Sequence, residues 1–462
     1  MAVNCIEKTS SALSDLDKLA EFIADMSYEQ IDQKTINQGI KVFFDTFGVM
    51  IRGSQEPEMQ KFTKSLAGTD RSAATLLTDG FPSTNYLWAA ISNGTEGIFM
   101  ELDEGHRPTG HPAIHIIPSA LAVAEAENRS GRDLLLAIIL GYEVTARISW
   151  ATKLKTGIHP HGHMGIVGAA VACGKLKGFN KTKIKEVMNV AATLPLHTTW
   201  EPCFEGATVR NAFTGISNAI GLVSAEMVDS GFTGLDEGVS YTFGELLGKS
   251  FDSSWLSKDL GKEFQILSNY FKFHACCVAN HPALDALQEI QKQYPDLNTN
   301  DIEQINVFVT DYSMVVNKYP ARNQLSAKFS LPFAVATTLY HGKALVEAFQ
   351  NDKVKIPEIC TIAEKVLVQA DPVLTKRWPT DVGAIVEIVQ KDGKVLRGTC
   401  SNAYGYWQNP CSTRDLINKF CSLTDPVFKV TEVEQVYQLF ETLPKRETVQ
   451  SFIEDLKKFN QK

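Results

Sequence analysis

Residues 110–148 read GHPAIHIIPSALAVAEAENRSGRDLLLAIILGYEVTARI. The part from Ala120 to Ala126 is rich in alanine and apolar almost throughout, which predicts a helix packed on all sides. The turn NRSGRD at 128–133 separates it from a second apolar run that starts at Leu134, where another buried helix is expected. The two runs predict a helical core.

Helical spacing of apolar residues recurs on both sides of this segment. Near the N-terminus such residues fall at i, i+3, i+4, i+7 and i+10, at Leu16, Leu19, Ala20, Ile23 and Met26. The chain has 462 residues, of which 44% are hydrophobic. That length exceeds what one hydrophobic core usually supports, so two domains are expected.

The pattern changes after about residue 266. Ile305–Val309 alternates as a strand does, and Ala384–Val389 is followed by an Asp-Gly turn and Val395-Leu396, which predicts a hairpin. Helices are expected between these strands, at Leu331–Leu339 and Ile362–Val368. The segment therefore predicts an α+β module.

These helical and strand patterns divide the chain into three segments. We expect a mainly α protein with a large helical domain that begins in residues 1–265, a smaller α+β domain in residues 266–397, and a return to the helical domain in residues 398–462. The return is expected because helical periodicity and charge-rich surfaces reappear from about Asp415.

Composition limits the partners and the compartment. The chain has 45 basic and 53 acidic residues, a net charge of -8, and no basic block, so nucleic acid is not an expected partner. The start lacks the apolar core of a signal peptide, and no apolar run approaches the roughly 20 residues that span a membrane. Nine cysteines, an odd number without tight spacing, are typical of a reducing compartment. A cytoplasmic protein is expected.

Eight of the ten histidines fall into three local groups: His106, His111 and His115; His159, His161 and His163; His274 and His281. Glu101, Asp103 and Glu104 come just before the first group, so one short segment offers carboxylates and imidazoles for acid–base catalysis near neutral pH. Pro112 suits the first turn of a helix, which would place His111 at a helix N-terminus that attracts anions. The alternative is a capped helix start with solvated acids and one structural histidine.

The segment His159-Pro160-His161-Gly162-His163 allows a metal site, but no matching ligand spacing occurs elsewhere, so a base or a structural histidine is preferred. The following GIVGAAVACGKLKG lacks GxxxxGK[ST] and a preceding strand, and its small residues favour close helix packing over phosphate binding. Cys276-Cys277 has no CxxC partner for an iron–sulfur cluster and is expected to be buried filler.

Arg210 lies in a short GATVRN segment between two helical stretches. Its guanidinium can bind a carboxylate through two hydrogen bonds. A surface arginine that closes a helix end is the alternative.

Six segments together resemble the MmgE/PrpD family, over nearly the whole chain and in the family's order: GHPAIHIIPSALAVAEA, SGRDLLLAIILGYEVTARI, HPHGHMGIVGAAVACGKLKGF, GATVRNAFTG, FKFHACCVANHPALDAL and AKFSLPFAVATTL. That family includes 2-methylcitrate dehydratases, cis-aconitate decarboxylases and an iminodisuccinate epimerase. The resemblance implies a large all-helical domain built from both chain ends, a smaller α+β lid domain and a homodimer.

The resemblance also implies a metal-free, cofactor-independent active site between the two domains. The family's acidic motif matches Glu101-Leu102-Asp103-Glu104, and its histidines match His111, His159 and His281. Asp103 and the three histidines are the catalytic candidates. Candidates for binding the substrate are Glu101, Arg210, Lys272, His106 and Arg107, and the last two are side chains that better-known members do not share.

Three positions depart from the decarboxylase pattern. Gly105 stands where those members have a threonine, Phe204 where they have a lysine, and Phe333 where they have a tyrosine. Each change removes a hydrogen bond or a charge that would position a tricarboxylate.

The leading hypothesis is a lyase of the 2-methylcitrate dehydratase type, acting on a small di- or tricarboxylate. His111 and His159 would share the acid and base roles and Asp103 would orient one of them. The alternatives are a dicarboxylate epimerase or racemase, a cis-aconitate decarboxylase-like enzyme, and a non-catalytic carboxylate-binding protein.

Overall fold

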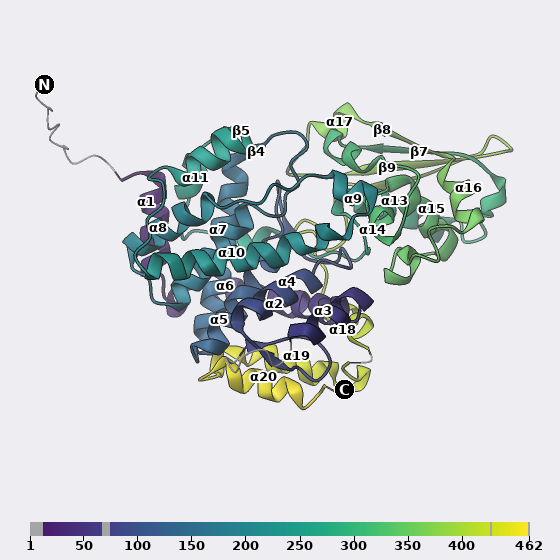
Figure 1. Cartoon of the computed structure of the whole chain (residues 1–462). Coiled ribbons are helices and arrows are strands. Elements are labelled where there is room, and N and C mark those ends of the chain that lie inside the picture. The colour runs from purple at the N-terminus through teal and green to yellow at the C-terminus, as the bar shows by residue number, and fades with distance from the viewer. Residues whose placement is uncertain (1–12, 67–73, 426, 461–462) are drawn as a thin grey trace, which may run out of the picture.

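A computed structural model of the chain describes residues 13–66, 74–425 and 427–460. A helical part and a smaller part with a four-stranded sheet lie side by side (Figure 1). The expected mainly α fold is confirmed. Cys5 and the first twelve residues, on which the signal-peptide argument depends, lie outside the described residues. The helices before residue 260 are α1 (Asp15–Asp25), α2 (Gln33–Ser54), α3 (Pro57–Leu66), α4 (Tyr86–Glu96), α5 (Pro112–Ala126), α6 (Gly131–Ala151), α7 (Met164–Leu176), α8 (Lys181–Ala192), α9 (Glu201–Glu205), α10 (Ala212–Asp229), α11 (Gly238–Tyr241) and α12 (Ser254–Ser257).

Helices α5 and α6 are the two buried helices that the opening segment predicts. Pro112 takes the first position of α5, where its missing N–H costs no hydrogen bond. Ser130 and Asp133 form a capping box at the start of α6, each side chain accepting the other's backbone N–H at 3.1 Å. Helix α6 is long and apolar enough to cross a membrane, but 94% of its most apolar window is buried inside the protein, as in a core helix.

The small residues of α7 permit close packing against its neighbours. A Cβ on Gly165 would lie 2.3 Å from Cγ of His115 on α5, and one on Gly168 would lie 2.0 Å from Oγ1 of Thr145 on α6. Larger side chains would push these helices apart. The glycines therefore bring the imidazole of His115 close to the start of α7, where the second histidine group lies.

The smaller part is built on a sheet with strand order β10-β9-β7-β8, in which β7 and β8 are parallel and the other pairs antiparallel. The expected hairpin joins β9 to β10, with Val389 opposite Val395, and Gly393 in its turn has a φ of 86°. The strands are β7 (Ile302–Val309), β8 (Val366–Ala370), β9 (Ala384–Gln390) and β10 (Val395–Cys400), and the helices are α13 (His281–Gln293), α14 (Gln324–Lys328), α15 (Leu331–His341), α16 (Pro357–Ala363) and α17 (Pro372–Thr375).

One expected element of this part is wrong. Ile362–Val368 was expected to be helical, but α16 ends at Ala363 and β8 begins at Val366. The run Val366–Val368 is rich in β-branched residues and pairs with β7, with Ile305 opposite Val366. A short apolar run suits either a helix or a strand, and here pairing with β7 decides for the strand.

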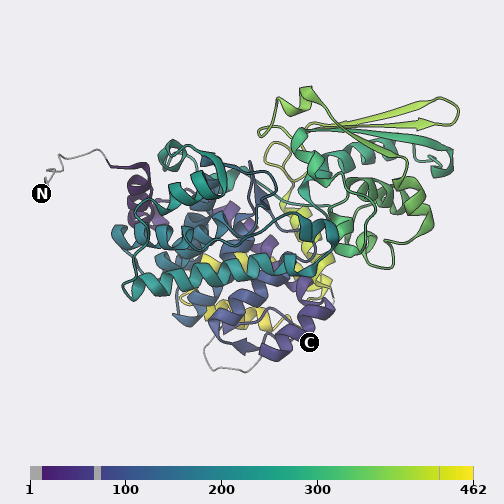
Figure 2. The ribbon, with the colours of Figure 1, turned by 45° about the horizontal axis from the view of Figure 1, so that its top comes forward.

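The C-terminal segment returns to the helical part through α18 (Thr413–Thr424), α19 (Val433–Glu441) and α20 (Val449–Lys457). Phe420 stacks on Phe44 of α2 with ring centroids 4.2 Å apart, and Lys419 forms a buried ion pair with Asp45 at 2.7 Å. Figure 2 shows these yellow helices among the purple and blue ones. The described C-terminal helices therefore pack against α2 in the helical part, and the expected domain boundaries stay predictions.

Short strand pairs tie loops together inside the helical part and at its edge. They are β1 (Ala74–Thr75) with β2 (Ser83–Thr84), β3 (Gly105–His106) with β6 (Asn269–Tyr270), and β4 (Thr152–Leu154) with β5 (Gly248–Phe251). The β3–β6 pair positions the candidate site.

Candidate active site

The segment between α4 and α5 carries the acidic motif. Glu101 adopts a left-handed backbone conformation, with a φ of 54°, and starts an extended path toward β3. In the β3–β6 pair Gly105 lies opposite Tyr270. Lys272 follows β6 by two residues, so this pairing brings its side chain to the acids from more than 160 positions away in the chain.

Four buried charges form the base of the site. The ammonium of Lys272 lies 3.0 Å from Oδ1 of Asp103 and 3.5 Å from Oε2 of Glu101. The guanidinium of Arg210 forms an ion pair with Oε1 of Glu101. All four side chains are at most 2% exposed, so the alternatives of solvated acids and of a surface Arg210 are wrong. Two carboxylates and two cations balance one another here.

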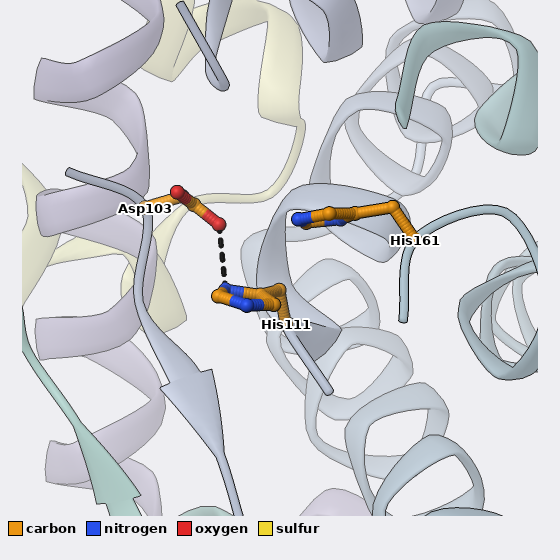
Figure 3. Close-up of side chains that lie close together, drawn as sticks. All are labelled: Asp103, His111 and His161. Carbon is orange, nitrogen blue, oxygen red and sulfur yellow. Dashed lines mark ion pairs between the residues drawn. The ribbon is translucent and has the colours of Figure 1, made fainter. Parts of the chain in front are cut away.

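His111 connects these charges to the rest of the site. Its Nδ1 lies 2.8 Å from Oδ2 of Asp103, the contact drawn as a dashed line in Figure 3, and 3.0 Å from the carbonyl oxygen of Glu104. Both neighbours are acceptors, so the neutral ring carries its proton on Nδ1 and keeps Nε2 as an acceptor. Burial acts to raise the pKa of Asp103, but Lys272 and His111 outweigh it and hold that pKa well below its usual value.

His159 has the opposite tautomer. Its Nδ1 accepts the backbone N–H of His161 at 3.2 Å, so its proton lies on Nε2 when the ring is neutral. Burial lowers the pKa of His159 well below its usual value, with Arg210 and His111 acting in the same direction. When both rings are neutral, the site therefore holds one imidazole whose Nε2 is the acceptor nitrogen and another whose Nε2 carries the N–H.

His161 lies between these two imidazoles. Its ring stacks on that of His111, with centroids 4.5 Å apart, and on that of His159 at 5.0 Å. Its Nδ1 shares a hydrogen bond with Nε2 of His115 at 2.9 Å. Its Nε2 points toward Asp103 and has no hydrogen-bond partner in the described part of the chain (Figure 3). A buried imidazole nitrogen without a partner is available to a ligand.

Other candidates from the sequence are placed elsewhere. His281 begins α13, and its Nε2 donates a hydrogen bond to the carbonyl oxygen of Cys276 at 3.2 Å. Its ring meets that of His274 edge to face. His106 is buried edge to face against Tyr142, and burial lowers its pKa to about 3. The roles assigned to these two residues stay predictions.

Arg107 is surrounded by aromatic rings. The centroids of Tyr270, Tyr312, Trp378 and Tyr406 lie between 5.0 and 5.7 Å from its guanidinium carbon, and the Tyr406 hydroxyl accepts a hydrogen bond from it. Cations stack favourably on such faces. The cage joins the site loop to Tyr312 and Trp378 of the sheet-containing part.

Asp103, His111 and His161 can also be considered as metal ligands. Their donor atoms lie within 4.8 Å of one another, and one carboxylate with two imidazoles suits a divalent transition metal. Lys272 lies 3.0 Å from the same carboxylate, however, and its charge opposes a second cation there. The residues fit an acid–base centre better, and a metal-free site stays a prediction.

Comparison with models of known protein families assigns this chain to a family. The profile of the MmgE/PrpD N-terminal domain matches residues 17–244, and that of the MmgE/PrpD C-terminal domain matches residues 274–444. The chain belongs to the MmgE/PrpD family. The site loop and the histidine row lie in the N-terminal domain, and Lys272 lies just before the C-terminal domain.

Curated relatives of this MmgE/PrpD chain carry an enzyme name. This chain is 24% identical to the cis-aconitate decarboxylase of Mus musculus, over 92% of this chain and 90% of that protein. It is 25% identical to the one of Homo sapiens, over 77% and 76%, and 20% identical to the one of Aspergillus terreus (strain NIH 2624 / FGSC A1156), over 95% and 94%. These matches identify the chain as an enzyme of the lyase type.

The structure accounts for the first departure from the decarboxylase pattern. A Cβ on Gly105 would lie 2.2 Å from Oη of Tyr270, so no larger residue fits at position 105 while Tyr270 keeps its place. The phenol hydroxyl thus occupies the space that a threonine side chain would take. A hydroxyl is present here, supplied from β6 instead of β3.

At the other two positions that differ from the decarboxylase pattern, a phenylalanine packs against another aromatic ring. Phe204 stacks on Trp200 with centroids 6.1 Å apart, and the ammonium of Lys318 lies 4.9 Å above its ring. Phe333 is fully buried against Phe349 at 6.1 Å. A lysine therefore lies near position 204, but it comes from the sheet-containing part.

Substitution of Gly105 by threonine tests the exchange with Tyr270. We expect the free energy of unfolding to fall by about 1–3 kcal/mol, because the new side chain overlaps the phenol. In a chain that already carries Tyr270→Ala, the same substitution should cost much less, and urea unfolding of the four proteins measures the coupling. Equal costs in both backgrounds would rule out the overlap.

Sequence reasoning missed His161, His115 and Tyr270 as members of the site. His161 stands two residues after His159 in HPHGH, so the local signal for it was present. Nothing near Tyr270 in the sequence indicates that its hydroxyl lies at Gly105, because that contact depends on the β3–β6 register.

Proposed function

We propose that this MmgE/PrpD enzyme is a lyase that acts on a small polycarboxylate and transfers a proton at the carbon next to a carboxylate, as in a 2-methylcitrate dehydratase. The observation that carries the proposal is the opposite hydrogen bonding of two imidazoles in one buried row: Nδ1 of His111 faces two acceptors, and Nδ1 of His159 faces a backbone N–H. His111 presents a bare Nε2, and His159 presents an N–H. Dehydration needs one group of each kind.

In the proposed reaction His111 takes the proton from the carbon, and the pair of electrons left behind forms the new double bond. The hydroxyl on the neighbouring carbon leaves with the proton of His159 as water. Asp103 stabilises the positive charge on His111, and its ion pair with Lys272 fixes its position. The free Nε2 of His161, between the two rings, is placed to contact the substrate or to return a proton from His111 to His159.

The reaction is tested with a panel of citrate, 2-methylcitrate and cis-aconitate. A dehydratase produces ultraviolet absorbance from a conjugated double bond without releasing CO2. Absence of turnover on every hydroxy acid in the panel would contradict the dehydratase. The enzyme's natural substrate within the polycarboxylate class is read from the highest kcat/KM.

A second candidate is cis-aconitate decarboxylation. It is favoured by the activity that the relatives' names give and by the Tyr270 hydroxyl at Gly105, which replaces one of the missing polar groups. Release of CO2 from cis-aconitate in the same panel would support it. An epimerase would instead incorporate solvent deuterium without new absorbance, since it returns the proton to the opposite face of one carbon.

We also propose that the enzyme is a homodimer that uses the outer face of α10. Ile216 and Val223 lie two turns apart on this helix and are 37% and 38% exposed. Phe213, Ile220 and Met227 are half-buried beside them. An apolar stripe of this length on a surface helix is typical of a protein–protein interface.

The dimer is tested with Ile216→Glu and Val223→Glu in one chain. We expect the double variant to sediment as a monomer while the parent chain sediments as a dimer, because the two charges would be buried without partners. Val430→Glu is the control, since Val430 is 59% exposed but belongs to the segment between α18 and α19. Dimers of unchanged stability in the double variant would place the interface elsewhere.

We further propose that the enzyme works in the cytoplasm, without a nucleic-acid or membrane partner. All eight cysteines among the described residues have free thiols, which supports a reducing compartment. Fractionation of cells with an antibody to the chain tests this placement.

A further inference from the structure

Glu104 is a buried acid of the site loop that the proposed reaction does not use. Its side chain is 1% exposed, and it lies directly before β3. The two cations at the base of the site are already paired with Glu101 and Asp103. No ion pair joins Glu104 to a cation among the residues that the structure describes. A third carboxyl group in this place is therefore expected to keep its proton, because a buried charge without a partner is costly.

The carboxyl group of Glu104 joins two helices. Its Oε1 accepts the backbone N–H of Ala113 in the first turn of α5 at 2.8 Å, and its Oε2 accepts the hydroxyl of Tyr142 on α6 at 3.0 Å. His111 precedes α5, but its own side chain makes no capping hydrogen bond in the described structure. Because Pro112 has no N–H, the N–H of Ala113 is the first free donor of the helix. Glu104 thus supplies the cap that the His111 side chain does not.

The backbone of Glu104 holds the imidazole that this cap leaves free. Its carbonyl oxygen lies 3.0 Å from Nδ1 of His111, and this contact, together with Asp103, leaves Nε2 as the acceptor nitrogen. One residue therefore fixes the start of α5 through its side chain and the ring at that start through its backbone. A shift of Glu104 relative to α5 would disturb both contacts together.

Burial raises the pKa of Glu104 to about 8. The carboxyl groups of Asp103 and of Asp45 on α2 act in the same direction, while the hydrogen bonds from Ala113 and Tyr142 oppose the rise. The titratable side chains around this residue are those of Asp45, Asp103, His111 and Tyr142. With a proton on Oε2 the carboxyl group can donate to the Tyr142 oxygen while Oε1 still accepts from Ala113.

We propose that Glu104 is a positioning residue of the acid–base centre, which works as a neutral carboxylic acid: it caps α5, ties α5 to α6 and keeps Nδ1 of His111 on its two acceptors. It acts through His111 and does not react with the substrate itself. The inference rests on the role of His111 in the proposed function, so its tests include measurements that need no substrate.

Substitution of Glu104 by leucine keeps a side chain of similar size but removes both side-chain hydrogen bonds. We expect kcat at pH 7 to fall by about 10–10²-fold with a smaller change in KM, since a base displaced by about 1 Å loses rate on this scale. Glu104→Gln keeps an acceptor for the Ala113 N–H and a donor for the Tyr142 oxygen, so it should recover most of this loss. A loss in Glu104→Gln as large as that in Glu104→Leu would contradict the neutral form.

Glu125→Leu is the matched control. Glu125 lies on the same helix, is 1% exposed and accepts a backbone N–H and a hydroxyl, both from Thr75, at 3.1 and 2.6 Å. Burial raises its pKa as well, to about 7. Its substitution should lower stability but keep the parent kcat. If Glu125→Leu lowers kcat as much as Glu104→Leu does, general loss of stability is the cause and the positioning role is wrong.

Nitrogen-15 NMR of the full chain with labelled histidine measures the tautomer of His111 without a substrate, with its signals assigned from His111→Ala. At a pH where the ring is neutral, the parent and Glu104→Gln should show a protonated Nδ1 and a bare Nε2, and Glu104→Leu should show a mixture of tautomers. A single unchanged tautomer in Glu104→Leu would overturn the inference. If these signals behave as expected but no acid of the panel is turned over, the proposed function fails and the positioning role stands.

The neutral state of Glu104 is tested by the pH dependence of unfolding. In the unfolded chain a glutamate ionises near pH 4.3, about its ordinary pKa. In the folded protein Glu104 keeps its proton up to its raised pKa of about 8, so the free energy of unfolding falls by this contribution as the pH rises between the two values. Glu104→Gln cannot ionise, and urea unfolding at several pH values should show that its proton linkage differs from that of the parent by about one proton in this range. Identical pH dependence in the two proteins would mean that Glu104 is charged in the folded state.

Discussion

Substitution of His111 by alanine is expected to lower kcat by about 10²–10⁴-fold, the usual contribution of a general acid or base. In the described site, His111 is the only imidazole whose Nδ1 faces two acceptors, Asp103 and the Glu104 carbonyl oxygen. This leaves its Nε2 as the nitrogen that can accept a proton, and the variant loses it. Turnover of the best substrate of the panel gives kcat, and circular dichroism checks that the fold is kept.

His281→Ala is the informative control for this experiment. The family resemblance makes His281 a catalytic candidate. In the structure, however, its Nε2 donates a hydrogen bond to the Cys276 carbonyl oxygen, apart from the histidine row. We expect its substitution to change kcat by less than about 10-fold, below the usual range for an acid or base. A loss as large as that of His111→Ala would show that the centre is assembled differently during turnover.

Substitution of Arg210 by methionine is expected to lower the free energy of unfolding by about 3–5 kcal/mol, because it leaves the buried carboxylate of Glu101 without its closest counter-charge. Lys272, at 3.5 Å, then remains its nearest cation and is already bound to Asp103 at 3.0 Å. Urea unfolding of parent and variant measures the difference.

Two further variants make this test specific. Addition of Glu101→Leu to Arg210→Met should recover much of the lost stability, since the pair is then replaced by apolar side chains. Arg414→Met removes one partner of an exposed pair with Glu434, in which both side chains are more than 60% exposed, and should leave the unfolding midpoint unchanged. An equal loss in the single and double variants would mean that the ion pair is not the cause.

The fold was predictable where the cause is local. Helices α5 and α6 follow from apolar runs, Pro112 and the Ser130 capping box, and the β9–β10 hairpin follows from its Asp-Gly turn. The strand β8 was missed because the run Val366–Val368 is compatible with a helix and with a strand, and only its pairing with β7 selects the strand. Pairing between distant segments is not visible in a local window.

The candidate site was likewise predictable only where its residues are close together in the sequence. Asp103 and His111 were predictable together because one loop carries both and a helix start follows. Lys272 came from the family resemblance, and Arg210 was a candidate because its guanidinium can bind a carboxylate, but no local pattern relates either residue to that loop. The stacking of His161 between two imidazoles and the fit of Tyr270 at Gly105 could not be predicted, because each depends on where separate elements pack.

The burial of the centre has a consequence for kinetics. His111, at 9%, is the most exposed of its charged and imidazole groups described above, and Lys272 is not exposed at all. Because these groups are covered, substrate reaches them only when neighbouring segments of the protein move aside. Opening and product release are then steps distinct from proton transfer, and either can limit steady-state turnover. Single-turnover measurements are thus the ones that report the chemistry of His111 directly.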